Sequence, residues 1–286
     1  MNTQFWLTQV FNGISYGALL FLVGSGLSLI FGVMRIVNLA HGSYFLLGGY
    51  VALSVIWTTG SWALALPVAA LSIAVVGLLM ERIFLRPLGF DPLRQVLLTV
   101  GFAFLFQQAA LDIWTGNNFD INPPDALTKS IVVGGLYLPL YRIFMIGTAL
   151  VIGVVLWLVM EKTRMGAAVR ATVDDAQMAR GVGIDTSRIS MLIFALGAFL
   201  AALGGVIGGA FLGIYPGLDF EMLPIAFAVV IIGGMGSLGG AAIGALVVGL
   251  ADNFGKALFP EVSYFTLYAP MALILAVKPT GLFGRE

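Results

Sequence analysis

The 286-residue sequence is 60% apolar and only 10% charged, whereas soluble domains average about 45–50% apolar and about 25% charged residues. This composition excludes an ordinary water-soluble domain, which needs more polar surface. The sequence has no cysteine, one histidine and a net charge of zero, so disulfides, cysteine- or histidine-rich metal sites and a basic nucleic-acid surface are not expected. The prediction is an all-α polytopic membrane protein, with residues 1–286 forming a single transmembrane domain.

Stretches without charged residues mark the candidate membrane segments. Arg35 is the only charged residue among the first 80, and the run 36–80 is about twice the roughly 20 residues that a spanning helix needs. This run therefore predicts two crossings, divided near Thr58–Ser61. The run 222–251 is too long for one upright helix and has glycines in its middle, which predicts two half-segments or one broken helix. Together the runs predict about nine crossings, with eight and ten as near alternatives.

Lysine and arginine residues concentrate in two loops, and this bias sets the predicted orientation. The loops 82–94 and 161–188 together hold 8 of the 14 basic residues, so both are predicted to lie in the cytoplasm. The intervening loop, at about 115–140, then lies outside the cell. Extending the same alternation places the N-terminus outside and the C-terminus inside.

The stretch Gly13-Ile-Ser15-Tyr-Gly17 matches the nucleophile elbow of serine hydrolases, which requires a strand-to-helix turn and a histidine partner. Here the stretch lies within an apolar helix, which favours close packing through small residues four apart. An intramembrane hydrolase that pairs a serine with His41 stays an alternative. The sequence has no G-x-x-x-x-G-K-[ST] pattern, so it offers no P-loop for ATP.

The acidic residues that could act inside the membrane lie at the ends of the predicted segments. They are Asp112, Asp219, Glu221 and Asp252. A proton- or sodium-coupled carrier usually places ionisable groups in mid-membrane, so this distribution counts against a carrier. A stand-alone secondary carrier or a channel for a small solute stays an alternative, because backbone carbonyls also bind sodium.

The loop 161–188 carries the clearest functional signal. A stretch of residues that favour a helix begins at Gly166, and Asp174 and Asp175 favour a turn that leads into a second short helix. Two short amphipathic helices in a cytoplasmic loop are typical of a surface that binds a partner protein. The alternative, on composition alone, is a solvated charged loop without a partner.

Three patterns resemble one family. The sequence Arg-x-Gly-x-Ala-x-Arg-Ala at 164–171, followed by Ala-x-x-x-Gly-Ile-Asp at 179–185, is similar to the cytoplasmic coupling loop of the branched-chain amino acid class of ABC-transporter permeases. The stretch Gly-Leu-Ser-Leu-Ile-Phe-Gly-Val-Met-Arg-Ile-Val-Asn-Leu-Ala-His-Gly at 26–42 and Gly-Gly-Met-Gly-Ser-Leu-Gly-Gly at 233–240 resemble signatures of the same family. Because the patterns lie near the start, middle and end, the resemblance covers nearly the whole chain.

The resemblance implies one permease subunit of an ATP-driven importer in a bacterial inner membrane, with its N-terminus periplasmic and its C-terminus cytoplasmic. Such a subunit pairs with a second, homologous permease, two cytosolic P-loop ATPase subunits and a periplasmic substrate-binding protein. It implies no catalytic residues and no cofactor in this chain, because ATP is bound by the partner subunits only. The implied substrate is a branched-chain or other small amino acid.

The resemblance also implies which residues of the loop contact an ATPase subunit. A short helix of such a loop sits in a groove of the ATPase, so that nucleotide-driven closure moves the membrane helices. The candidate contact residues are Gly166, Ala167, Arg170, Asp174, Ala179, Gly183 and Asp185.

A second set of candidates concerns the substrate pathway or its inner gate. Arg35, Asn38 and His41 are three apart and are predicted to share a helix face, with Arg35 near the cytoplasmic interface because charge at mid-membrane is costly. Asn38 and His41 then point into the bundle, where they line the pathway or, alternatively, satisfy helix ends and fix packing. The full set of pathway candidates is Asn38, His41, Gly42, Gly236 and Ser237.

Overall fold

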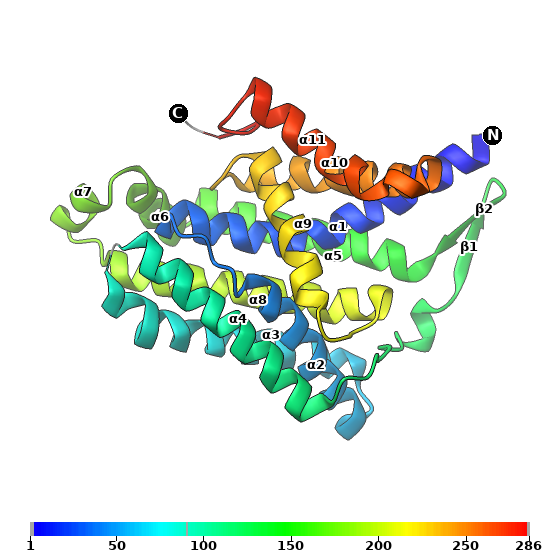
Figure 1. Cartoon of the computed structure of the whole chain (residues 1–286), viewed down its shortest axis with the longest axis horizontal. Coiled ribbons are helices and arrows are strands. Elements are labelled where there is room, and N and C mark those ends of the chain that lie inside the picture. Colours follow the sequence, from blue (N-terminus) through cyan, green and yellow to red (C-terminus); the bar gives the residue numbers. More distant parts are fainter. Residues whose placement is uncertain (1–2, 90, 285–286) are drawn as a thin grey trace.

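The computed structural model describes residues 3–89 and 91–284, which form a bundle of α-helices with one small β-hairpin (Figure 1). The predicted all-α polytopic architecture is confirmed. The hairpin is not among the predicted elements, although Gly134-Gly135 between two short apolar runs is a usual hairpin turn signal. The helices are α1 (Thr3–Met34), α2 (His41–Thr59), α3 (Trp62–Met80), α4 (Pro92–Trp114), α5 (Leu140–Lys162), α6 (Arg164–Asp174), α7 (Ala176–Gly181), α8 (Thr186–Leu212), α9 (Leu218–Gly233), α10 (Leu238–Leu258) and α11 (Ser263–Val277), and the strands are β1 (Ser130–Val133) and β2 (Leu136–Pro139), paired antiparallel.

Within the described residues, six helices are long and apolar enough to cross a membrane. They are α1, α3 with its continuation to Leu88, α4, α5, α8 and α10. The remaining predicted segments appear as α2, α9 and α11, which have 19, 16 and 15 residues. Since a helix rises 1.5 Å per residue, α9 and α11 fall short of the roughly 30 Å of a bilayer core.

Both predicted interruptions are confirmed. The run 36–80 divides where α2 ends at Thr59 and the Ser61 hydroxyl accepts a hydrogen bond from Leu64 N, as the N-cap of α3. The run 222–251 divides at the glycine-rich turn 234–237, which separates α9 from α10. Gly234 and Gly236 have φ values of 99° and 81°, a left-handed region that glycine enters without the steric cost of a Cβ.

Helix α1 is the central element of the bundle. It is buried from Ser15 to Ile30 and contacts α5, α8, α9 and α10. A helix that is apolar on all sides belongs in the interior, and glycines let its neighbours approach closely. A Cβ at Gly17 would lie 2.8 Å from the carbonyl oxygen of Ala245, and one at Gly26 would lie 2.7 Å from that of Gly197. The packing interpretation of the glycine spacing is confirmed at Gly17.

Helix α2 begins in the interior of the bundle. After α1 ends at Met34, Arg35 adopts a positive φ of 54° and residues 35–40 are not helical. The chain turns back along α1, so that His41 Nε2 lies 3.0 Å from the carbonyl oxygen of Val23. Val23 precedes Met34 by 11 residues, or about 16 Å of helix, which is about half the thickness of a bilayer core. The first turn of α2 therefore lies near the middle of the predicted membrane layer.

Helix α9 begins beside α2. A Cβ at Gly42 would overlap the carbonyl oxygen of Asp219, and it would lie 3.1 Å from Leu223 Cβ. From there α9 runs steeply across α1, in yellow over blue (Figure 1), toward the turn 234–237. The sequence predicts a break within 222–251 but not the unwound segment 213–217 that precedes α9.

The two ends of the bundle differ in character. The start of α1 and the β1–β2 hairpin lie at one end, while α6 and α7 lie at the other (Figure 1). The described C-terminal residues return to the α9–α10 turn, because Leu282 N and Phe283 N donate to the carbonyls of Ile232 and Gly233. Gly236 of this turn packs on Gly32, near the end of α1. The start of α1 and the C-terminal segment therefore lie at opposite ends of the bundle.

The close approach of α8 to α2 at Gly205 provides a test of this packing. A Cβ there would overlap the carbonyl oxygen of Phe45, whereas a Cβ at Gly101 of α4 would meet nothing within 4 Å. Gly205→Ala should lower stability by about 1–3 kcal/mol, the usual cost of overpacking, and Gly101→Ala should not. The measurement is the fraction of detergent-purified protein that stays monodisperse after heating; equal losses in both variants would contradict the packing.

Candidate translocation and docking sites

Asn38 and His41 are wholly buried where the chain enters α2. The Asn38 side-chain oxygen accepts a hydrogen bond of 3.1 Å from Ala40 N, and the Asn38 carbonyl accepts one of 3.3 Å from His41 N. The prediction that Arg35, Asn38 and His41 share a helix face is wrong, because α1 ends at Met34 and Asn38 lies in the unwound segment. The bonds that Asn38 and His41 make support the packing role, while Asn38 Nδ2 and His41 Nδ1 have no partner.

The contact between the first turns of α2 and α9 contains a buried carboxylate. Asp219 is 2% exposed, and its Oδ2 accepts a hydrogen bond of 3.1 Å from the Ser43 hydroxyl. Gly42, a predicted pathway residue, packs on the Asp219 backbone. The sequence places Asp219 at the end of a segment and therefore does not identify it as a site residue. Asp219 does lie at the start of a helix, but this start is inside the protein. Asp252, also assigned to an end, is buried within α10 and pairs with Lys256 at 2.8 Å.

Aromatic rings lie beyond this contact, on the hairpin side. Tyr50 of α2 stacks on Trp114, with ring centroids 5.0 Å apart, and Trp57 meets Phe119 edge-on at 5.3 Å. Phe119 pairs with Ile214 through two backbone hydrogen bonds of 2.7 and 2.8 Å. The loop between α4 and β1 is thereby fixed to the unwound segment that leads into α9.

Gly236 and Ser237, the other predicted pathway residues, lie in a different place. A Cβ at Gly236 would lie 2.9 Å from Gly32 Cα. The Ser237 hydroxyl accepts a hydrogen bond from Gly240 N at 3.0 Å and so caps α10, and its carbonyl accepts one from Ser28 at 3.3 Å. This turn packs on the last part of α1, whereas Asn38, His41 and Gly42 surround its middle. The structure does not bring the two groups of candidates together.

The loop 161–188 folds as predicted into two short helices, α6 and α7. The Thr163 hydroxyl caps α6 by accepting from Gly166 N at 3.1 Å. Asp175 caps α7 by accepting from Gln177 N and Met178 N at 2.8 and 2.9 Å. Serine, threonine and aspartate are preferred N-caps because their oxygens satisfy free N–H groups.

The candidate ATPase contacts in this loop divide into inward and outward residues. Gly166 and Arg170 face the end of α5, where Arg170 donates to the Met160 carbonyl and a Cβ at Gly166 would overlap it. Ala179 is buried, Gly183 holds a φ of 88°, and Asp185 caps α8. These five residues shape the loop, and Gly183 and Asp185 among them are also exposed, as are Ala167 and Asp174.

Two exposed apolar residues on this loop were missed by sequence reasoning. Met178 is 70% exposed and Val182 is 77% exposed, and they lie four residues apart on α7 and the turn that ends it. Apolar residues within a charged cytoplasmic loop are the signal that could have found them. Exposed apolar patches are a usual mark of protein-interaction surfaces.

The loop is packed firmly against the membrane helices. Val169 of α6 is buried in a small apolar cluster that also contains Leu29 of α1, Met160 of α5 and Ile193 of α8. The position of α6 is therefore fixed relative to three transmembrane helices, and a displacement of α6 reaches all of them.

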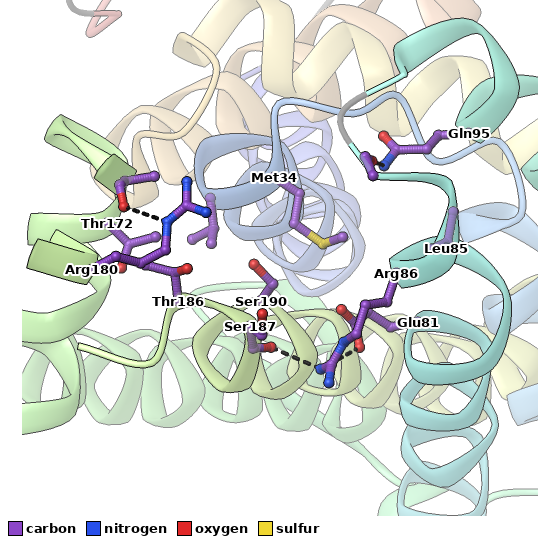
Figure 2. Close-up of a pocket in the computed structure, with 13 residues that line it drawn as sticks. Met34, Glu81, Leu85, Arg86, Gln95, Thr172, Arg180, Thr186, Ser187 and Ser190 are labelled. Carbon is purple, nitrogen blue, oxygen red and sulfur yellow. Dashed lines mark hydrogen bonds and ion pairs between the residues drawn. The ribbon is translucent and has the colours of Figure 1, made fainter. Parts of the chain in front are cut away.

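A hollow of about 170 Å³ lies beside α7 (Figure 2). Arg86, from the segment after α3, donates to the buried Glu81 carboxylate at 3.1 Å and to the Ser187 carbonyl at 3.0 Å. Arg180 of α7 lines the other side (Figure 2). The two basic loops, 82–94 and 161–188, therefore lie at the same end of the bundle, as their predicted cytoplasmic location requires.

The hydrolase alternative finds no geometric support. The Ser15 hydroxyl donates to the Phe11 carbonyl at 2.7 Å within its own helix, and the His41 ring contacts the Val23 carbonyl. The elbow pattern at 13–17 lies in the middle of α1 rather than at a strand-to-helix turn. In the described part of the chain, no group of three or more histidine or acidic side chains is arranged to hold a metal ion.

A bundle of long apolar helices, with a two-helix platform formed by α6 and α7 at one end, defines the chain as a polytopic membrane protein. The sequence model of the family described as "Branched-chain amino acid transport system / permease component" matches residues 9–275. The chain belongs to this family, which confirms the resemblance seen in its three sequence patterns.

Several curated relatives match along the whole chain. The high-affinity branched-chain amino acid transport system permease protein LivH of Salmonella typhimurium is 31% identical, over all of this chain and 98% of that protein. The corresponding permease protein BraD of Pseudomonas aeruginosa is 28% identical, over 98% of this chain and 96% of its own length. The autoinducer 2 import permease protein LsrC of Escherichia coli is 29% identical over 66% of this chain. No solved structure matches the chain significantly.

The N-cap of α7 can be tested by removing its carboxylate. Asp175→Ala should free two N–H groups and weaken α7 by about 1 kcal/mol. We expect the amides of residues 177–182 to exchange with deuterium about fivefold faster, measured by mass spectrometry. Asp175→Asn keeps an acceptor and should exchange like the unchanged protein; equal protection in the alanine variant would contradict the capping role.

Proposed function

We propose that this chain is a permease subunit of an ATP-driven importer for branched-chain or other small amino acids. The observation that carries the proposal is the α6–α7 platform, which presents Met178 and Val182 outward and is packed through Val169 onto three transmembrane helices. A platform with these two properties converts the movement of a docked partner into movement of membrane helices. The names of the full-length relatives support the substrate class.

The proposed assembly contains a second, homologous permease, two cytosolic P-loop ATPases and a periplasmic substrate-binding protein. This chain has no P-loop sequence of its own, so ATP is bound and hydrolysed on the partner subunits. The transport work of the chain is alternating access, in which the platform follows the ATPases and shifts the helices around a central path.

The proposed location is the bacterial inner membrane, with the platform in the cytoplasm. Both basic loops meet at the hollow beside α7, and positive residues favour the cytoplasmic side. The start of α1 and the β1–β2 hairpin lie at the other end (Figure 1), so the N-terminus is periplasmic. The C-terminal segment lies at the α9–α10 turn, on the cytoplasmic side.

The assembly is tested by purifying the tagged chain from native membranes in a mild detergent. We expect a second permease and two P-loop ATPases to copurify, because the platform needs partners to act. Recovery of the chain alone, repeatedly and in good yield, would contradict the proposal and favour a stand-alone carrier or a channel. In that case uptake would also resist depletion of ATP.

The docking surface is tested by placing a charge on it. Val182→Glu should abolish ATPase copurification and ATP-dependent uptake, because a buried interface excludes an unpaired carboxylate. The matched control is Val132→Glu on the β1–β2 hairpin, where Val132 is also an exposed apolar residue, at 56%. The control should keep its ATPases; normal assembly of the Val182 variant would show that α7 is not the contact.

A further inference from the structure

Asp219 is a buried acid without a cationic partner. In the described part of the chain, Asp219 forms no ion pair. Asp219 Oδ1 makes no hydrogen bond, although Oδ2 accepts one from Ser43. A carboxylate buried at membrane depth is costly unless it is paired or marks a functional site. The Oδ1 acceptor of Asp219 is therefore available to a ligand.

Several of the unpartnered buried polar atoms belong to α2 or to the segments next to it. Of the five buried side-chain polar atoms without a partner in the described residues, four belong to α2, its entry segment and Asp219. These are Asn38 Nδ2, His41 Nδ1, Tyr50 OH and Asp219 Oδ1. Ser43 and Tyr50 are seven residues apart, which places them on one face of α2. Buried polar groups are normally satisfied, so the unpartnered Asp219 Oδ1 and Tyr50 hydroxyl indicate a position that a polar ligand occupies for part of the cycle.

We propose that Asp219 binds the ammonium group of the solute as it passes the middle of the membrane, with Ser43 beside it. The contact lies about half a bilayer from the end of α1, where a permeating solute is farthest from water. The aromatic rings of Tyr50, Trp114 and Phe119 lie toward the hairpin side and offer an apolar wall. A carboxylate next to an apolar wall suits a small aliphatic molecule with a protonated amine.

This inference rests on the proposed function, because it assigns a site to the transported solute. The first test is uptake of radiolabelled L-leucine by native membrane vesicles that contain the whole assembly. Asp219→Asn keeps the size and an acceptor for Ser43 but removes the charge, and it should reduce initial uptake about tenfold or more. Glu221→Gln is the matched control: it lies on the same helical turn, is exposed, and accepts from Tyr215 at 2.7 Å.

The control should transport normally, and copurified ATPases should be unchanged in both variants. Full uptake by Asp219→Asn would overturn the proposal, because the carboxylate would then serve only as a hydrogen-bond acceptor. Loss of the ATPases from Asp219→Asn would also overturn it, because the residue would then act on assembly rather than on the solute.

The second test uses the absence of cysteine from the sequence. Ser43→Cys introduces one thiol next to Asp219, which can be labelled with cationic aminoethyl or anionic sulfonatoethyl methanethiosulfonate in membranes that are turning over ATP. If the site opens and holds ammonium groups, the cationic reagent should react about tenfold faster or more. Excess L-leucine should protect the thiol.

The preference for the cation should disappear in the double variant Ser43→Cys, Asp219→Asn. A thiol that never reacts, or that reacts equally with both reagents, would overturn the inference even where the ATPases copurify. A cation preference that depends on Asp219 in a chain that purifies alone would instead refute the ATP-driven assembly and leave the ammonium site standing. Failure of the ammonium site and failure of the ATP-driven assembly therefore give different results.

Discussion

Backbone groups that leave a helix inside a membrane need partners within the protein, and the segment 35–40 depends on this constraint. Leu39 N donates to the Thr99 hydroxyl of α4 at 3.2 Å, and Ala40 N donates to the Asn38 side chain. With these partners the chain can leave the helical conformation after α1, turn back toward the middle of α1 and begin α2 there. The interior start of α2, and with it the contact to Asp219, depends on a few side chains that replace helical hydrogen bonds.

Close backbone contact replaces the hydrophobic effect as the source of cohesion between these helices, because lipid tails are as apolar as leucine. Three of the contacts described above share one geometry, in which a glycine faces another backbone. They are Gly26 on Gly197, Gly42 on Asp219 and Gly236 on Gly32. The second and third fix the two ends of the steeply crossing α9 against α2 and α1. The position of Asp219 thus follows from where glycine permits helices to touch.

The sequence predicts the helices, the two interruptions and the two-helix loop, because these depend on local composition and turn residues. It does not predict the depth at which a helix starts. Asp219 lies at a segment end in the sequence, and only the return of the chain after Met34 shows that this end is interior. In the loop, the family pattern selects Gly166 and Arg170, which build the platform, whereas exposure identifies Met178 and Val182. A pattern of residue types does not separate residues that shape a surface from those that present it.

Helix α1 connects the α6–α7 platform to the contact between α2 and α9 in the interior of the bundle. Leu29 of α1 packs with Val169 of α6, Gly32 lies against Gly236, and Val23 accepts from the His41 ring. Close-packed contacts of this kind shift as units rather than stretch, since interiors are dense and deform little. In the proposed cycle, a displacement of α6 therefore moves the end of α1 together with the α9–α10 turn. Because Asp219 lies in the first turn of α9, that movement reaches the contact between α2 and α9 without any change in the helices themselves.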